Sequence, residues 1–139
     1  MKDIVSYKDC LNCKACCKFF EKYKHLRPLI KIKKGYKKVN LKRKNNYYIC
    51  SYFKKGLCVI HDKKPFDCKI YPFHFMKNGN DVFLAYDNSC KGIKNKKKKD
   101  ILKYADYLEK CIKKNNLIKK NKKYIVNFEK WLTPIKKIY

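Results

Sequence analysis

The stretch CLNCKACC at residues 10–17 brings four cysteines together within eight positions. Two-residue spacers between Cys10, Cys13 and Cys16 let three thiolates converge on one metal centre, and the same spacing opens the cluster-binding run of bacterial ferredoxins. Cys17 follows Cys16 directly, and because adjacent side chains generally diverge, we expect one of the two to serve a second centre. The stretch therefore predicts a thiolate metal site around which the fold is built.

The later cysteines extend this set. Eight of the nine cysteines are the predicted metal ligands: Cys10, Cys13, Cys16, Cys17, Cys50, Cys58, Cys68 and Cys90. The ninth, Cys111, falls on an apolar helical stripe and is predicted to be a buried packing residue. Cytosolic thiols are kept reduced, so this many cysteines favour metal binding over disulfides, although disulfide-rich intracellular proteins of hyperthermophiles keep that alternative open.

No segment indicates export or membrane insertion. No stretch approaches about eighteen consecutive apolar residues, and no apolar signal segment follows Met1-Lys2-Asp3. We therefore expect a cytoplasmic protein without a membrane partner.

The spacing leaves the cofactor open between an iron–sulfur cluster and zinc. Paired Cys-x2-Cys spacing occurs in zinc sites built from four cysteines, yet zinc ribbons carry two such pairs, and here the later cysteines are single. Three convergent cysteines with remote single ligands favour an iron–sulfur cluster of the 4Fe–4S kind. The ferredoxin pattern itself fails after Cys16, because no fourth cysteine and proline follow.

The segment after the cysteine run is predicted to be helical at first. Residues 16–25 (CCKFFEKYKH) can continue as a helix that ends before Pro28, because the residue ahead of a proline avoids the helical region. Residues 29–41 are basic and alternate in part around Gly35, which indicates a loop or a weak hairpin.

A hairpin is predicted next. Residues 47–53 (YYICSYF) and 57–60 (LCVI) are rich in aromatic and β-branched residues and flank Lys54-Lys55-Gly56. Such a hairpin would bring Cys50 and Cys58 near each other.

A turn and a second hairpin follow. Residues 64–72 (KPFDCKIYP) are bracketed by prolines and predict a turn or short helix that carries Cys68. Residues 73–76 and 82–86 predict two strands around the turn at 78–80.

Two helices are predicted for the C-terminal part. From Asp100, a possible N-cap, apolar residues recur at helical spacing as far as Ile112. A second helix is predicted over 124–132, with Asn121 as its start and Thr133-Pro134 as its interruption.

These elements predict a small α+β fold: a cysteine-rich metal-binding domain with short β-hairpins and C-terminal helices. We expect a single domain over residues 1–139. Residues 10–92 would form the cysteine-rich core and residues 93–139 the helical part.

The order of the motifs resembles the CxxCxxCC zinc- or iron-chelating domain family. Its signature is Cys-x2-Cys-x2-Cys-Cys, a cysteine pair around a hairpin, Arg-Pro-x2-Cys-Arg-x-Tyr-Pro-Phe, and a late cysteine near a glycine. The chain has CLNCKACC at 10–17, Cys50 and Cys58 around YFKKGL, KPFDCKIYPF at 64–73, and Cys90-Lys91-Gly92. Lys64 and Lys69 stand where family members usually have arginine, which puts in doubt any role that needs a planar guanidinium.

The resemblance implies metal chelation by the matching cysteines and little about a reaction. The motif also occurs in flagellin lysine N-methylases. This chain is too short and, with four glycines, too poor in glycine for an added Rossmann-type cofactor domain, so methyl transfer is not carried over.

The charge is strongly basic. Lysine and arginine number 38 against 11 acidic residues, a net charge of +27, and only Arg27 and Arg43 are arginine. Such a potential attracts nucleic acid. However, arginine is the usual residue for bidentate phosphate and base contacts, and its scarcity argues against a dedicated nucleic-acid reader.

The sequence leads to three alternative hypotheses of function. The leading one is a metal-binding protein for electron transfer or for metal or cluster handling, with metal ions and a redox protein as partners. The first alternative is an enzyme whose cluster, held by three thiolates, leaves one iron position open. The second is a zinc-stabilised module that binds nucleic acid.

Further polar residues near the cysteines are candidates for the site. His61 and His74 could ligate a metal or hydrogen-bond a cluster sulfur. Asp62 and Asp67 could orient ligands. No paired carboxylates and no nucleophile with a neighbouring base predict a catalytic residue.

Overall fold

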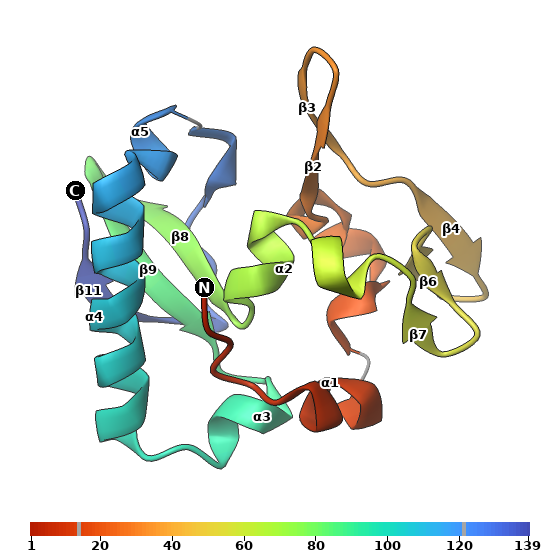
Figure 1. Cartoon of the computed structure of the whole chain (residues 1–139), viewed down its shortest axis with the longest axis horizontal. Coiled ribbons are helices and arrows are strands. Elements are labelled where there is room, and N and C mark those ends of the chain that lie inside the picture. Colours follow the sequence, from red (N-terminus) through yellow and green to blue (C-terminus); the bar gives the residue numbers. More distant parts are fainter. Residues whose placement is uncertain (14, 121) are drawn as a thin grey trace. The chain divides into compact units, whose positions relative to one another are not determined.

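The computed structural model describes residues 1–13, 15–120 and 122–139 and has a small α+β fold, as predicted (Figure 1). It divides into two compact units. We call Tyr7–Lys69 the cysteine unit, and Met1–Ser6 together with Ile70–Tyr139 the sheet unit. The expectation of a single domain stays a prediction.

The cysteine unit consists of short elements. Its helices are α1 (Tyr7–Cys13), the 3-10 helices η1 (Ala15–Cys17), η2 (Glu21–Leu26) and η3 (His61–Lys63), and α2 (Phe66–Ile70), at which the unit ends. Its strands are β1 (Lys18–Phe19), β2 (Leu29–Ile32), β3 (Gly35–Lys38), β4 (Leu41–Lys44), β5 (Tyr47–Cys50), β6 (Phe53–Lys54) and β7 (Leu57–Cys58). They form a sheet in the order β1-β5-β4 and two separate hairpins, β2-β3 and β6-β7.

The helix predicted over residues 16–25 is wrong. Two 3-10 helices, η1 and η2, cover the ends of this range, but Lys18–Phe19 between them forms strand β1, which pairs antiparallel with β5. Phe19 is buried while Phe20 is exposed, the alternation of a strand. Cross-strand pairing with the aromatic segment around Tyr48 therefore overrides the local helical tendency.

Both predicted hairpins of this unit form. The segment after Pro28 folds as β2 and β3, with Gly35 at a φ of 97° next to the turn. The second hairpin is shorter than expected, because β5 ends at Cys50 and only Phe53–Lys54 pairs with β7. Its turn has two residues, Lys55 and Gly56, both with positive φ, the geometry of a tight hairpin whose twist matches the strands.

The short helix predicted to carry Cys68 is confirmed as α2. It follows Pro65, whose fixed φ suits the start of a helix. His25 in η2 lies on the surface.

The sheet unit is built on one mixed sheet. Its strands are β8 (Phe73–Asn78), β9 (Asp81–Asp87), β10 (Ile125–Val126) and β11 (Leu132–Lys137), in the order β10-β8-β9-β11. Its helices are α3 (Lys91–Lys94), α4 (Lys98–Asn115), α5 (Leu117–Lys120) and the 3-10 helix η4 (Lys122–Tyr124). The predicted hairpin around residues 78–80 is confirmed as β8-β9 and is longer at both ends.

Helix α4 covers one face of this sheet, as Figure 1 shows beside β9 and β11. Its buried stripe includes Ala105, Leu108 and Ile112. The Tyr104 ring centre lies 5.3 Å from that of Phe73 on β8. The opposite face of the sheet has its own cluster of Met76, Ala85 and Leu132, with Val126 and Trp131 packed against it.

Three details of α4 differ from expectation. The helix begins earlier, with Lys97 at its N-cap and Asp100 inside the first turn, where a carboxylate favours the positive end of the helix. Leu102 is exposed, although the helical spacing of the apolar residues between Asp100 and Ile112 predicts that it belongs to the buried stripe. Cys111 is half-buried rather than buried.

The prediction of a second C-terminal helix is wrong. Residues 125–126 and 132–137 form β10 and β11, and the predicted start, Asn121, lies outside the described residues. Pro134 sits at a register shift of β11, the last strand of the sheet order, where the missing N–H costs no ladder hydrogen bond. The β-branched and aromatic residues around Trp131 gain more from the sheet than from a helix.

None of the described helices is both long enough and apolar enough to cross a membrane.

Candidate metal centre

Seven of the eight predicted ligands belong to the cysteine unit. They lie on α1 (Cys10, Cys13), η1 (Cys16, Cys17), β5 (Cys50), β7 (Cys58) and α2 (Cys68). Cys10 and Cys13 are three residues apart on one helix and therefore share a face of it. No disulfide joins cysteines in the part of the chain that the structure describes.

Strand pairing brings the end of the cysteine run to β5. Lys18 pairs with Ile49 and Phe19 with Tyr48 in antiparallel register. Continuing that register by one residue sets Cys17 opposite Cys50. Two segments more than thirty residues apart in sequence thus carry cysteines to the same end of one sheet.

The β6-β7 hairpin carries the next cysteine. Cys58 pairs with Phe53, a few residues after Cys50. The bend between the two strand segments is held by backbone hydrogen bonds, from Ser51 to Asn40 at 3.0 Å and from Val59 to Tyr52 at 2.9 Å. The expected proximity of Cys50 and Cys58 has this structural basis.

Charge interactions connect five thiols of this unit. Burial raises the pKa of Cys68 well above its usual range. The thiols of Cys16, Cys50 and Cys58 raise that pKa further, because like charges disfavour ionisation of a neighbour. Burial likewise raises the pKa of Cys50, and Cys58 and Cys16 add to the effect.

Cys16 and Cys17 form a hydrogen-bonded pair. The hydrogen bond that Cys17 donates lowers the pKa of Cys16 to about 7, against burial, and the ammonium of Lys64 lowers it too. The pKa of Cys17 is raised by the same hydrogen bond and by burial, and by the charges of Cys50 and Cys58. Cys16 is therefore the thiol of this pair that ionises first.

Two further residues fix the segments around the thiols. Asp67 Oδ2 accepts a 2.8 Å hydrogen bond from the backbone N–H of Leu29, and burial raises its pKa to about 6. The His61 ring lies 4.3 Å, centre to centre, from that of Tyr7 at the start of α1. Asp62 is fully exposed.

The remaining candidates lie in the sheet unit. Cys90 is buried just before α3, and its role as a ligand stays a prediction. His74 packs edge-on against Tyr71 and Trp131, and its buried Nε2 has no hydrogen-bond partner in the described part of the chain. Within residues 1–13, 15–120 and 122–139, no three Cys, His, Asp or Glu side chains are placed to hold a metal ion.

Sequence reasoning missed the role of Lys64. The sequence marks this lysine only as a substitute for an arginine, whereas in the structure its charge helps to lower the pKa of Cys16. The available signal was that Lys64 is a cation next to Pro65 and four residues before the predicted ligand Cys68. Its influence on Cys16, far away in sequence, arises only in the folded chain.

Comparison with protein-family models, curated proteins and solved structures finds no match for this chain.

Proposed function

We propose that the cysteine unit binds a metal centre through thiolates, an iron–sulfur cluster in the first place and zinc as the alternative. The observation that carries the proposal is that the pairing of β1 with β5 sets Cys17 opposite Cys50 at one end of a sheet, while the charges of Cys50 and Cys58 raise the pKa values of both Cys17 and Cys68. A pair of cysteines set opposite each other from segments far apart in sequence is typical of metal ligands rather than of packing residues.

The chemistry of the donor set supports the same conclusion. Burial raises the pKa values of Cys50 and Cys68, and the charges of neighbouring thiols raise them further. A bound cation stabilises all of the thiolates at once and deprotonates its ligands. Charge interactions act over longer distances than a metal–thiolate bond of about 2.3 Å, so binding would draw the thiols closer together.

Cys10 and Cys13 complete the proposed centre. Their shared face on α1 and the short link to η1 support convergence with Cys16, the arrangement that favours a cluster over a zinc ribbon. The resemblance to the CxxCxxCC family implies the same chemistry. We propose electron transfer, or handling of the metal or cluster, as the role of the centre.

The test is elemental analysis of protein purified without oxygen. Iron with acid-labile sulfide and a brown colour would identify a cluster, and zinc alone would identify the alternative. The matched variants are Cys17→Ser and Cys50→Ser, with Cys111→Ser as the control because Cys111 lies on α4 in the sheet unit. The first two should lower the metal content and the control should not. Metal-free protein, or equal loss in all three variants, would overturn the proposal.

A further inference from the structure

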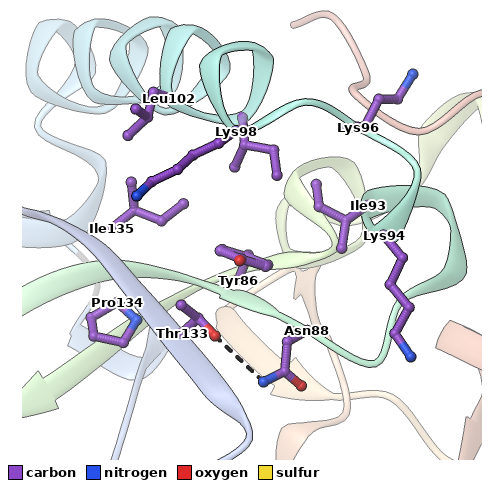
Figure 2. Close-up of a pocket in the computed structure, with 11 residues that line it drawn as sticks. Tyr86, Asn88, Ile93, Lys94, Lys96, Lys98, Leu102, Thr133, Pro134 and Ile135 are labelled. Atoms are coloured by element: carbon purple, nitrogen blue, oxygen red, sulfur yellow. Dashed lines mark hydrogen bonds between the residues drawn. The ribbon is translucent and has the colours of Figure 1, made fainter.

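The sheet unit contains a cavity that the proposed metal centre does not use. It has a volume of about 530 Å³, is partly open to solvent, and lies between β9, β11, α3 and the first turn of α4 (Figure 2). Small-molecule sites in proteins span about 300 to 1,000 Å³. The cavity is therefore large enough for one organic ligand of moderate size.

An aromatic ring and aliphatic side chains line the inside. Figure 2 shows Tyr86 in the middle of the group, with Ile93 and Ile135 on either side of it. Phe73 is the cross-strand partner of Tyr86 on β8 and is fully buried, with its ring centre 6.3 Å from that of Tyr86. The tyrosine ring is half-buried and held in place, as a stacking partner for a flat ligand must be.

Two neutral polar groups stand beside this ring. Thr133 pairs with Tyr86 across β11 and β9, so both face the cavity from adjacent strands. Asn88 Nδ2 donates to Thr133 Oγ1 at 3.4 Å, a long hydrogen bond. An amide and a hydroxyl held so loosely to each other keep capacity to donate to and accept from a ligand.

The rim is cationic. Lys94, Lys96 and Lys98 line the cavity, and no Asp or Glu is among the described residues that do so. Figure 2 shows Lys98 reaching from α4 along the cavity toward Ile135, whereas Lys94 at the end of α3 and Lys96 on the loop after it stand at the opposite edge. The positive end of the α4 dipole adds to this potential, because Lys98 is the first residue of that helix. Such a rim selects for an anionic group.

We infer that this cavity binds a nucleotide, with the base against Tyr86 and the phosphate at Lys98, inside the positive potential to which Lys94 and Lys96 add. A planar base, a hydrogen-bonding edge and a phosphate match the aromatic ring, the amide–hydroxyl pair and the cationic rim, respectively. Inorganic anions would use only the rim, and apolar ligands only the interior. The nucleotide is either free or one unit of a single strand of DNA or RNA, since both present the same chemistry.

The experiment measures the contributions of the base and of the phosphate to binding separately. Binding to the full chain is measured by calorimetry at low salt with AMP, with adenosine, which lacks the phosphate, and with ribose 5-phosphate, which lacks the base. AMP should bind at least about tenfold more tightly than either fragment, because stacking and charge contribute together. A labelled strand of about ten nucleotides is the second arm, within the usual site size of single-strand binders. Tighter binding of the strand than of AMP that is weakened by Tyr86→Leu but not by Lys110→Ala identifies nucleic acid as the source, and tighter binding of AMP identifies a free nucleotide.

Variants locate the site. Tyr86→Leu and Lys98→Ala should each weaken AMP or strand binding about tenfold, whereas Tyr86→Phe should keep most of the affinity because it keeps the ring. Lys110→Ala is the charge-matched control, since Lys110 is exposed farther along α4 and does not line the cavity. Absence of binding to both AMP and the strand overturns the inference. So does ribose 5-phosphate binding as tightly as AMP, or equal losses in Lys98→Ala and Lys110→Ala.

Discussion

Asp67 accepts a hydrogen bond of 2.8 Å from the backbone N–H of Leu29, across 38 positions of sequence. The bond ties α2, which carries Cys68, to the first residue of β2. Leu29 is buried, so its N–H depends on this carboxylate for a partner. One side chain thus fixes the position of a predicted metal ligand relative to the rest of the cysteine unit.

Removing this acceptor should destabilise the cysteine unit. Asp67→Ala leaves the Leu29 N–H unsatisfied, whereas the amide oxygen of Asp67→Asn can still accept the bond. The alanine variant should therefore be about 1 to 2 kcal/mol less stable than the asparagine variant in chemical denaturation. Equal stabilities of the two would show that the hydrogen bond contributes nothing.

Removal of metal should affect the two units differently. If the thiolates of Tyr7–Lys69 hold the metal, chelation removes free energy that folds that unit, because structural metal binding and folding share one free energy. The sheet unit has its own core and should keep its protection. Hydrogen exchange with mass spectrometry, before and after chelation under reducing conditions, measures this by segment. Unchanged protection across residues 7–69 would contradict a structural metal.

The buried histidine predicts a pH dependence of stability. Burial lowers the pKa of His74 to about 4, from the ordinary value of 6.5. In the unfolded chain His74 takes up a proton below about pH 6.5, while in the folded protein it stays neutral to about pH 4, so its contribution to stability is lost as the pH falls through this window.

His74→Phe removes this proton uptake. Between pH 8 and pH 5 the free energy of unfolding of the variant should shift by about 2 kcal/mol in its favour relative to the original protein. The comparison cancels the titration of all other groups, including Asp67, whose raised pKa acts in the opposite direction. A constant difference between the two proteins over this range would refute the assignment.

The two leucines of α4 offer a matched test of the core. Leu108 is 0% exposed and Leu102 is 42% exposed on the same helix. Leu108→Ala should lower the free energy of unfolding by about 2 to 5 kcal/mol, because it leaves a cavity against the sheet. Leu102→Ala should cost much less. Similar losses in the two variants would mean that α4 does not pack on the sheet through Ala105, Leu108 and Ile112.

Gly92 approaches Val5 too closely for a side chain. A Cβ at position 92 would lie 2.6 Å from Val5 Cγ1. Gly92→Ala should therefore destabilise the sheet unit by about 1 to 3 kcal/mol through overpacking. Combining it with Val5→Ala removes the opposing methyl groups, so the double variant should be more stable than the sum of the single effects predicts. Simple additivity would rule out the contact as the cause.

Several elements were predictable because their signals are local. The hairpin of β8 and β9 follows from a turn sequence between alternating strands, and α2 from the prolines that bracket it. The buried stripe of α4 is predictable because its apolar residues recur at helical spacing. The strands that replaced predicted helices, β1 and β11, have partners far along the chain, and no local pattern shows that a partner exists.

The amino-acid sequence by itself determined the α+β class, the spacing of the cysteines and the strongly basic charge, because these depend on composition and on neighbours a few residues away. Only the tertiary structure decided which thiols interact, that Lys64 stabilises the Cys16 thiolate, and that Tyr86, Thr133 and three lysines line one cavity. The physical reason is that pairing and packing energies between distant segments exceed local conformational preferences, and they are set only when the whole chain is folded.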